Sequence, residues 1–271
     1  MPELPEVETT RRGLQRRLRG LRVTDVIVRE RRLRYRVTPG LRGKLAGRRV
    51  ARIARRGKYL LFHLDDGCLL CHLGMSGSFR IAGGGQAAGS HDHLDIVFSG
   101  GKILRFRDPR KFGAVLWVGG EPLRHKLLAG LGPEPLGAGF GGDYLYEQSR
   151  GRSAPVKHFI MDSRVVAGVG NIYANESLFI AGIHPARRAG RVSRQRYQTL
   201  AAAIRRVLQR AIRKGGTTLR DFVKEDGQPG YFGQTLAVYQ RGGKACPACG
   251  GVIRSRVLGQ RSTFYCPRCQ R

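Results

Sequence analysis

Acidic residues are scarce in this chain. Its 271 residues include 19 Asp and Glu against 50 Lys and Arg, which leaves a formal net charge of +31. Long apolar runs are missing as well, since none approaches the roughly 18 residues that a membrane-spanning helix needs. The N-terminus also lacks the basic-then-apolar layout of a secretory signal. We therefore expect a protein of the cytoplasm with no membrane partner.

The excess of positive charge favours a polyanionic partner, either nucleic acid or an anionic membrane surface. The Arg and Lys residues are interleaved with Leu, Val and Ile rather than gathered in a tail, so they predict an ordered basic surface. A duplex-binding protein is the first interpretation, but ribosomal and structural RNA-binding proteins share this charge profile. Composition therefore does not establish an enzyme.

The first half of the chain predicts one helix followed by strands. Residues 3–19 place Val7, Thr10, Leu14 and Leu18 on one helical face. Short apolar runs bounded by turn residues then predict antiparallel strands, as in a β-sandwich or barrel. We expect these strands at residues 22–29, 50–55, 59–64, 68–73, 78–82, 94–98, 103–106 and 114–118.

The second half is predicted to be mainly helical. Gly and Pro are frequent between residues 119 and 155, which indicates a hinge or linker. Beyond it, residues 171–180 and 193–214 have apolar side chains at helical spacing. Ser193 can cap the start of the second of these helices, and Gly215-Gly216 can end it.

Four of the six cysteines form two Cys-x2-Cys pairs near the C-terminus, and their spacing predicts a zinc ribbon. Zn²⁺ prefers four tetrahedral ligands, and each pair supplies two thiolates from one tight turn. Two disulfides are the alternative, which a chain without export signals disfavours. Because protein ligands would fill every position, we expect one structural zinc ion, held by Cys246, Cys249, Cys266 and Cys269. Cys68 and Cys71 lie in an apolar strand and are expected to be buried, inert thiols.

The start of the chain, Pro2-Glu3-Leu4-Pro5-Glu6-Val7, has two interpretations. Pro2 and Pro5 can simply open a helix, where proline costs little because the first N–H groups have no intrahelical partner. Alternatively, removal of Met1 would turn the Pro2 nitrogen into a free secondary amine, and an α-amino group titrates near ~8. Such an amine can attack a sugar carbon to form an iminium, as catalytic lysines do, with the Glu3 carboxyl beside it to transfer protons.

Seven motifs occur along the chain in an order that one enzyme family shares. They are Pro2-Glu3-Leu4-Pro5-Glu6-Val7-Glu8, Arg56-Gly57-Lys58-Tyr59, His72-Leu73-Gly74-Met75-Ser76-Gly77, His91-Asp92-His93, Asp108-Pro109-Arg110-Lys111-Phe112-Gly113, Gly168-Val169-Gly170-Asn171-Ile172-Tyr173, and Gln260-Arg261-Ser262-Thr263-Phe264-Tyr265-Cys266 in the zinc ribbon. With these motifs the chain resembles, from end to end, the formamidopyrimidine-DNA glycosylases. These bifunctional bacterial enzymes remove oxidised purines such as 8-oxoguanine and cut the strand.

The resemblance implies an α+β fold in domains. An N-terminal antiparallel β-sandwich flanked by helices would occupy residues 1–135. A helical helix-two-turn-helix DNA-binding domain would occupy residues 136–236, and a zinc-ribbon β-hairpin packed with it would occupy residues 237–271. A monomer would bind double-stranded DNA that contains oxidised bases or abasic sites, in the cleft between the domains. Its place would be the bacterial cytoplasm, at the nucleoid.

The resemblance also implies four catalytic residues. Pro2 would attack C1′ of a flipped-out nucleotide, and Glu3 would protonate the sugar ring oxygen as the damaged base departs. The iminium acidifies the C2′ proton, so β- and δ-elimination would remove both phosphates. Lys58 would serve the first elimination as proton donor and phosphate contact. Arg261 matches the position assigned to the second elimination, although the permanent charge of arginine favours a phosphate clamp.

Eight DNA contacts are implied as well. Met75, Arg110 and Phe112 would fill the gap left by the flipped base, with Arg110 hydrogen-bonded to the orphaned cytosine. Met75 and Arg110 lie in turn sequences, which favours exposed tips over core positions. Arg220 lies in the loop that would cover the extruded base, where many relatives carry lysine. Phosphate contacts are implied for His91, Arg152, Lys157 and Asn171, the last of which can equally be an ordinary helix cap.

Three alternatives stay open at this point. Endonuclease VIII enzymes share the fold and the N-terminal proline but prefer oxidised pyrimidines; the Met75 tip and the 108–113 segment favour the purine enzyme. A non-catalytic, zinc-dependent DNA-binding protein would grip duplex without forming a covalent adduct. An RNA-binding housekeeping protein would bind RNA tightly without selecting a lesion.

Overall fold

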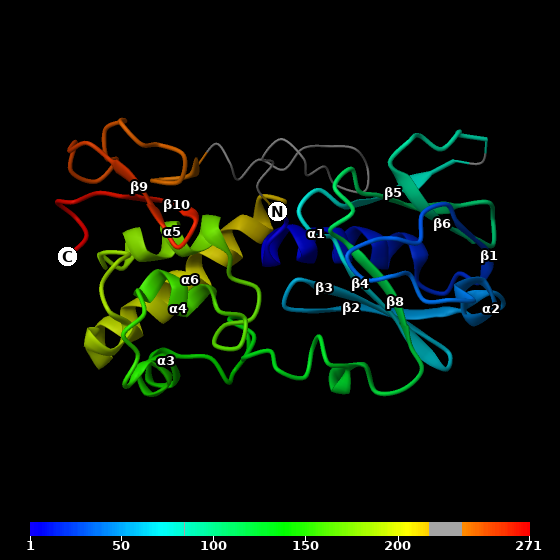
Figure 1. Cartoon of the computed structure of the whole chain (residues 1–271), viewed down its shortest axis with the longest axis horizontal. Coiled ribbons are helices and arrows are strands. Elements are labelled where there is room, and N and C mark those ends of the chain that lie inside the picture. Colours follow the sequence, from blue (N-terminus) through cyan, green and yellow to red (C-terminus); the bar gives the residue numbers. More distant parts are fainter. Residues whose placement is uncertain (84, 217–234) are drawn as a thin grey trace. The chain divides into compact units, whose positions relative to one another are not determined.

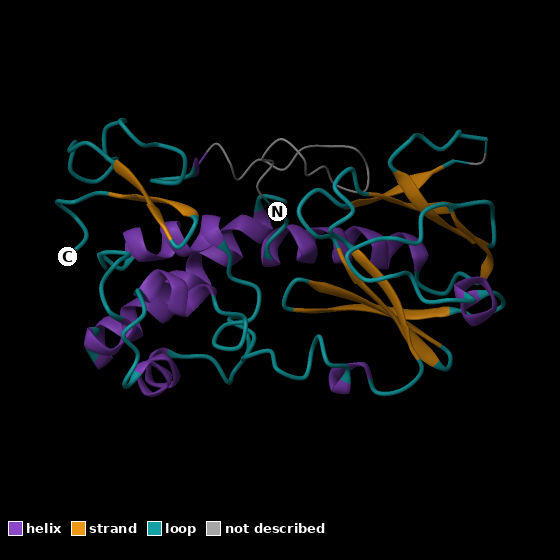
Figure 2. Cartoon of the chain, viewed as in Figure 1, coloured by secondary structure: helices purple, strands orange, loops and turns teal. Residues whose placement is uncertain are grey.

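The computed structural model describes residues 1–83, 85–216 and 235–271 (Figures 1 and 2). Contacts between residues divide the chain into two units. The first unit contains residues 1–129 and 214–216, and the second contains residues 130–213 and 235–271. Within these described ranges, no helix combines the length and the apolar character that crossing a membrane requires.

The first unit is a sandwich of two antiparallel sheets, each of four strands. One sheet has the order β1 (Val23–Val28), β6 (Asp92–Phe98), β7 (Ile103–Arg107), β5 (Ser78–Ala82). The other has the order β2 (Val50–Arg56), β3 (Tyr59–Leu64), β4 (Gly67–His72), β8 (Ala114–Val118). Every predicted strand is present within two residues of its predicted bounds.

Aromatic and aliphatic side chains from both sheets form one core. The ring of Phe62 on β3 lies 5.8 Å from that of Phe79 on β5, and Phe79 lies 5.0 Å from Phe106 on β7. Helix α1 (Leu4–Leu18) packs on β2 and β3 through the face predicted from the sequence, since Val7, Thr10, Leu14 and Leu18 are all buried. Short helix α2 (Leu41–Leu45) packs on β1, and a 3-10 turn η1 spans Pro122–Arg124.

The second unit is built around the long helix α6 (Arg194–Arg213), against which α3 (Gly142–Ser149) and α5 (Asn171–Ile180) pack. Helix α4 (Val156–Met161) contacts α5, and a 3-10 turn η2 spans Ala189–Arg191. A hairpin of β9 (Arg254–Leu258) and β10 (Arg261–Tyr265) lies against α5 through β10. Both helices predicted in this part of the chain are confirmed.

The predicted linker over residues 119–155 is wrong where α3 lies. Gly142 opens this helix, and a Cβ atom at Gly142 would come within 2.4 Å of the Gln198 backbone in α6. The glycine therefore permits a close helix–helix approach rather than a hinge. Leu145 is fully buried, and the Tyr144 hydroxyl donates to the Val165 carbonyl at 3.0 Å.

Candidate active site and nucleic-acid interface

The N-terminus of α1 positions Pro2 and Glu3. Glu3 is the residue that caps the helix, with an extended backbone, and its N–H donates to Glu6 Oε2 at 2.8 Å. Pro2 and Glu3 are both buried, whereas Met1 is 42% exposed. The two interpretations of this segment are therefore compatible: the prolines open a helix, and the helix holds the Pro2 nitrogen and the Glu3 carboxyl side by side in the chain.

Lys58 lies in the two-residue turn that joins β2 to β3, between the paired residues Arg56 and Tyr59. Gly57, the other turn residue, has φ +56°, a conformation that glycine adopts without strain. This turn places the half-buried Lys58 at the end of the second sheet.

His72 is a functional candidate that sequence reasoning missed. It pairs with Tyr59 across β3 and β4, and the two rings lie 4.7 Å apart. Burial, together with the charges of Lys58 and Arg34, lowers the pKa of His72 to about 4. The imidazole is therefore neutral near pH 7, and its Nδ1 accepts a hydrogen bond from the Gly74 N–H at 3.0 Å. Its place at the start of the motif His72-Leu73-Gly74-Met75-Ser76-Gly77 was the available signal in the sequence.

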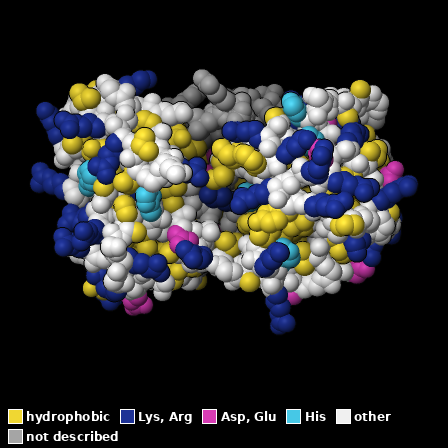
Figure 3. Space-filling view, viewed as in Figure 1, with side chains coloured by type: hydrophobic (Ala, Val, Ile, Leu, Met, Phe, Trp, Pro, Cys, Tyr) yellow, Lys and Arg dark blue, Asp and Glu magenta, His cyan; other side chains and the backbone are white. Residues whose placement is uncertain are grey.

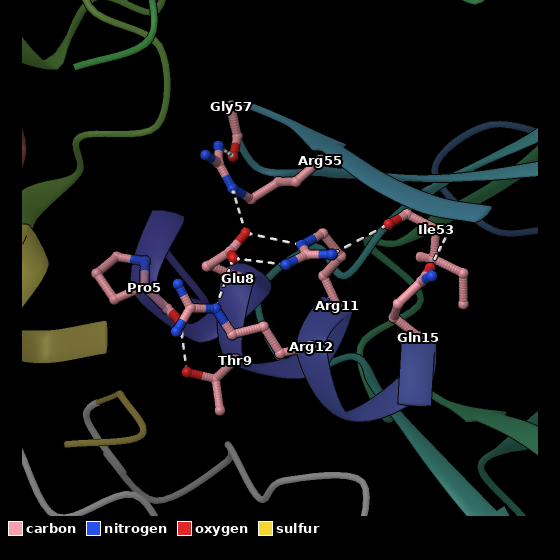
Figure 4. Close-up of polar contacts among 9 residues, drawn as sticks. All are labelled: Pro5, Glu8, Thr9, Arg11, Arg12, Gln15, Ile53, Arg55 and Gly57. Carbon is pink, nitrogen blue, oxygen red and sulfur yellow. Dashed lines mark hydrogen bonds and ion pairs between the residues drawn. The ribbon is translucent and has the colours of Figure 1, made fainter. Parts of the chain in front are cut away.

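A cluster around Glu8 ties α1 to the Lys58 turn (Figure 4). The Glu8 carboxylate accepts hydrogen bonds from Arg11 at 2.9 and 3.0 Å, from Arg12 at 2.8 Å and from Arg55 at 3.2 Å. Arg55 also donates to the Gly57 carbonyl at 2.9 Å. Burial raises the pKa of Glu8, but the arginine hydrogen bonds and charges outweigh it and lower the pKa to about 2. One carboxylate thus connects the helix that carries Pro2 with the turn that carries Lys58.

Two neighbouring turns present Met75, Arg110 and Phe112. Met75 lies in the turn between β4 and β5, and Arg110 and Phe112 lie between β7 and β8. Phe112 is 46% exposed, and an Arg110 Nη2 donates to the Met75 carbonyl at 3.2 Å. The predicted turn positions are confirmed, and the structure brings these three residues together. His91 adjoins them, because its carbonyl accepts from the Asp108 N–H at 3.0 Å.

In the second unit, Lys157 and Asn171 converge on the zinc hairpin beside Arg261. Lys157 is buried, and its Nζ donates to the Ser262 carbonyl at 3.0 Å and to Thr263 Oγ1 at 2.7 Å. Asn171 Nδ2 donates to the same Ser262 carbonyl at 3.0 Å. Asn171 is the first residue of α5 and follows the cap residue Gly170. Arg261 opens β10 and is exposed.

Arg152 is not part of this group. Arg152 is exposed after α3, and its backbone bonds to Ser149 and Gly190. Arg220 lies outside the described residues. Gly216, at the start of its predicted loop, lies close to Glu6, because a Cβ atom at Gly216 would be 3.2 Å from Glu6 Oε1.

Sequence reasoning also missed two buried polar residues of α5. Asn175 Oδ1 accepts from the Phe264 N–H of β10 at 2.8 Å. The Glu176 carboxylate accepts three backbone N–H groups, from residues 237–239, at 2.8 to 2.9 Å. These side chains attach both the hairpin and the segment before it to α5. Polar residues one turn after Asn171, on a helix that is otherwise apolar, were the signal.

The four cysteines of the two Cys-x2-Cys pairs form one cluster. Their Sγ atoms all lie within 4.8 Å of one another, with Cys246 and Cys269 at 3.9 Å and Cys249 and Cys266 at 3.5 Å. Tetrahedral thiolates at the usual zinc–sulfur distance are about 3.8 Å apart, so the donor set fits zinc. By contrast, Cys68 and Cys71 are buried in β4, and burial raises the pKa of the Cys68 thiol to about 12. Both predictions about the cysteines are confirmed.

Comparison with known proteins gives the same family over the whole chain. Residues 1–115 match the formamidopyrimidine-DNA glycosylase N-terminal domain, residues 131–223 match its H2TH domain, and residues 243–271 match the zinc finger found in FPG and IleRS. The zinc-finger match and the cysteine cluster together show that the ribbon binds one structural zinc ion.

Individual relatives agree with these family matches. The formamidopyrimidine-DNA glycosylase of Methylococcus capsulatus is 59% identical, covering 100% of both chains. A Lactococcus lactis FPG mutant, solved with DNA containing Fapy-dG, superposes with a TM-score of 0.93 at 34% identity over 100% of both chains. The wild-type Lactococcus lactis FPG, solved with DNA containing an oxidised pyrimidine, gives a TM-score of 0.92 at 34% identity over the same coverage.

Proposed function

This chain belongs to the formamidopyrimidine-DNA glycosylase family, and from that premise we propose how its own residues perform the reaction. It is a DNA glycosylase with AP lyase activity that acts in the repair of oxidised DNA. Its substrate is double-stranded DNA that contains oxidised purines or abasic sites. The observation that carries the assignment to particular residues is the buried Pro2–Glu3 start of α1, fastened by one carboxylate to the turn of Lys58.

The first chemical step belongs to Pro2 and Glu3. Once Met1 is removed, the unprotonated Pro2 amine attacks C1′ of the flipped-out nucleotide. Glu3 gives a proton to the sugar ring oxygen as the ring opens, and the C1′–base bond breaks as the departing base takes up the proton that the Pro2 nitrogen loses. The product is a Pro2 iminium at C1′. The capped helix N-terminus fixes both groups before the substrate arrives, which lowers the entropic cost of reaching the reactive geometry.

The later steps use the positive charge of the iminium. It acidifies the C2′ proton, whose removal expels the 3′ phosphate by β-elimination; δ-elimination then expels the 5′ phosphate. We assign Lys58 to proton transfer and phosphate contact in the first elimination. Arg261 acts as a phosphate clamp in the second, because its guanidinium stays charged. The neutral imidazole of His72, close to Lys58, adds no further cation there.

DNA recognition is divided among groups in both units. Met75 and Phe112 fill the vacated stack, and Arg110 reads the orphaned cytosine. We retain His91, Arg152, Lys157 and Asn171 as phosphate contacts and Arg220 as the residue over the extruded base. The exposed Arg261 precedes Ser262, whose carbonyl accepts from Lys157 and Asn171, and this position on the hairpin supports a phosphate site there.

The cellular setting and the domain boundaries belong to the same proposal. We place the protein in the bacterial cytoplasm, at the nucleoid, as a monomer. We divide it at residues 135 and 236 into a catalytic domain, a helical domain and a zinc finger. A preference for oxidised purines is proposed, with oxidised pyrimidines as slower substrates, since one relative has been solved with DNA containing such a base.

Trapping with borohydride tests the proposal. Wild-type protein incubated with duplex containing 8-oxoguanine opposite cytosine, in the presence of borohydride, is expected to yield a covalent adduct on Pro2. Pro2→Gly is expected to lose most of that adduct, and the intact mass establishes whether Met1 has been removed. An adduct on another side chain, or none with processed wild type, would refute the assignment. Faster excision of thymine glycol than of 8-oxoguanine on matched duplexes would favour the endonuclease VIII alternative.

A further inference from the structure

We infer that Asp108 is a positioning residue that sets opposite-base specificity by fastening the Met75 turn to the Arg110–Phe112 turn. The inference rests on the proposed function, in which these turns enter the DNA stack. Each turn connects the two sheets of the sandwich, one from β4 to β5 and the other from β7 to β8. They are separate in sequence, so something besides the chain itself must hold them in register.

The Asp108 side chain makes that link. It is fully buried, and its two oxygens bond to the two different turns. Oδ1 accepts from the Ser76 hydroxyl at 2.8 Å, and Oδ2 accepts from the Gly113 N–H at 2.7 Å. Ser76 Oγ in turn accepts from the Arg110 N–H at 3.3 Å. A single carboxyl group therefore holds the residue after Met75 and the residue after Phe112.

The backbone of Asp108 extends the link to the start of β6. Its N–H donates to the His91 carbonyl at 3.0 Å, and its carbonyl bonds to His93 Nε2 at 2.8 Å and to the Lys111 N–H at 3.1 Å. Lys111 has φ +56°, and it is the one non-glycine residue with positive φ among the described residues of the first unit. Such a conformation persists only where the surroundings dictate it.

Close packing leaves the two turns little room to move. A Cβ atom at Gly74 would lie 2.4 Å from the carbonyl carbon of Phe112, and one at Gly113 would lie 2.9 Å from the His72 carbonyl oxygen. The turns touch backbone to backbone, and Asp108 supplies the polar contacts at this junction. If the carboxyl is altered, buried donors lose their acceptor, and the Arg110 guanidinium is no longer held within the narrow tolerance that base recognition needs.

The experiment measures specificity rather than activity alone. We compare single-turnover excision of 8-oxoguanine opposite cytosine with excision opposite adenine, for wild type, Asp108→Asn and Ser76→Ala. Asp108→Asn leaves one side-chain oxygen, which can accept from either the Ser76 hydroxyl or the Gly113 N–H but not from both. Ser76→Ala removes the hydroxyl that bridges Asp108 to the Arg110 N–H. Both variants are expected to lower the cytosine-to-adenine rate ratio by about five- to tenfold, the value of one base contact. Trapping on single-stranded abasic DNA, which has no opposite base, is expected to stay within about twofold.

Asp95→Asn is the matched control. Asp95 is also buried in the first sheet and is ion-paired with Arg105 at 2.8 Å and Arg29 at 2.7 Å, but its carboxylate bonds to neither turn. This variant is expected to lose stability yet keep the wild-type ratio. An unchanged ratio in both Asp108→Asn and Ser76→Ala, or an equal fall in Asp95→Asn, would overturn the inference while leaving the proposed function standing. Failure of wild type to form an adduct would overturn both.

Discussion

The structure predicts most directly how replacing Glu8 by Gln changes the free energy of unfolding. The carboxylate lies between α1 and the β2–β3 turn, with three arginines around it (Figure 4). Its side chain is 12% exposed. Gln keeps the shape and one acceptor oxygen but loses the charge. The variant therefore isolates the electrostatic part of the link between Pro2 and Lys58.

The magnitude follows from the pKa. A pKa of about 2 in the folded protein against an ordinary 4.5 corresponds to about 3 kcal/mol of stability from the ionised carboxylate. Because the folded pKa is the lower one, this contribution is fully present above pH ~4.5 and is lost as the pH falls towards ~2. The difference in unfolding free energy between wild type and Glu8→Gln is expected to be about 3 kcal/mol at pH 7 and about 2 kcal/mol smaller at pH 3.

Urea denaturation of both proteins at pH 7, 5 and 3 measures this difference. The other acidic groups are common to both proteins, so their titration cancels in the comparison. A difference below about 1 kcal/mol at pH 7, the size of an exposed ion pair, would refute the reasoning. So would a difference that stays constant from pH 7 to pH 3. Borohydride trapping of Glu8→Gln at pH 7 adds a functional measure: adduct formation is expected to continue while strand cleavage, assigned to Lys58, slows.

Three further predictions concern other parts of the molecule. Chelation of zinc is expected to unfold the ribbon and abolish tight duplex binding; unchanged binding in a fluorescence-anisotropy titration would contradict it. Gly74→Ala is expected to destabilise the protein by about 2 kcal/mol or more, because φ is +64° and the added Cβ would meet the Phe112 backbone; a melting temperature equal to that of wild type would exclude this. Arg261→Ala is expected to reduce the slope of log affinity against log salt by about 0.9, one phosphate contact; an unaltered slope would mean that Arg261 binds no phosphate.

The strands and the zinc ligands could be predicted because their signals are local. Short apolar runs between turn residues locate β3, β5 and β8 to the residue, and the turn Ser99-Gly100-Gly101 is formed by two glycines with positive φ. The Cys-x2-Cys spacing fixes the zinc ligand set in the same way, since each pair lies within one turn. Helix α5 begins where a glycine-rich turn ends, as its sequence indicates.

What escaped prediction depends on contacts between distant residues. From the sequence alone, Gly142 is interpreted as a linker residue. Its role depends on the Gln198 backbone, which packs against it in the fold. Lys157 reads as a surface cation, yet it is buried because the Ser262 carbonyl and the Thr263 hydroxyl, more than 100 positions away, accept from it. The pKa of His72 likewise depends on burial and on the charges of Lys58 and Arg34 around it. The pattern and spacing of residues along the sequence do not predict these contacts between distant residues.

Many of the few acidic residues are buried in the structure. Seven acidic residues are buried in the described part of the chain: Glu3, Glu6, Glu8, Asp92, Asp95, Asp108 and Glu176. Among the described Lys and Arg residues, only Arg105 and Lys157 are buried to that degree. These seven carboxylates therefore act inside the protein, and its surface is more positive than composition alone implies. Figure 3 shows Lys and Arg side chains spread over the visible face. Amide substitutions of buried acids should consequently alter stability and positioning, while the salt dependence of DNA binding should stay with the exposed arginines.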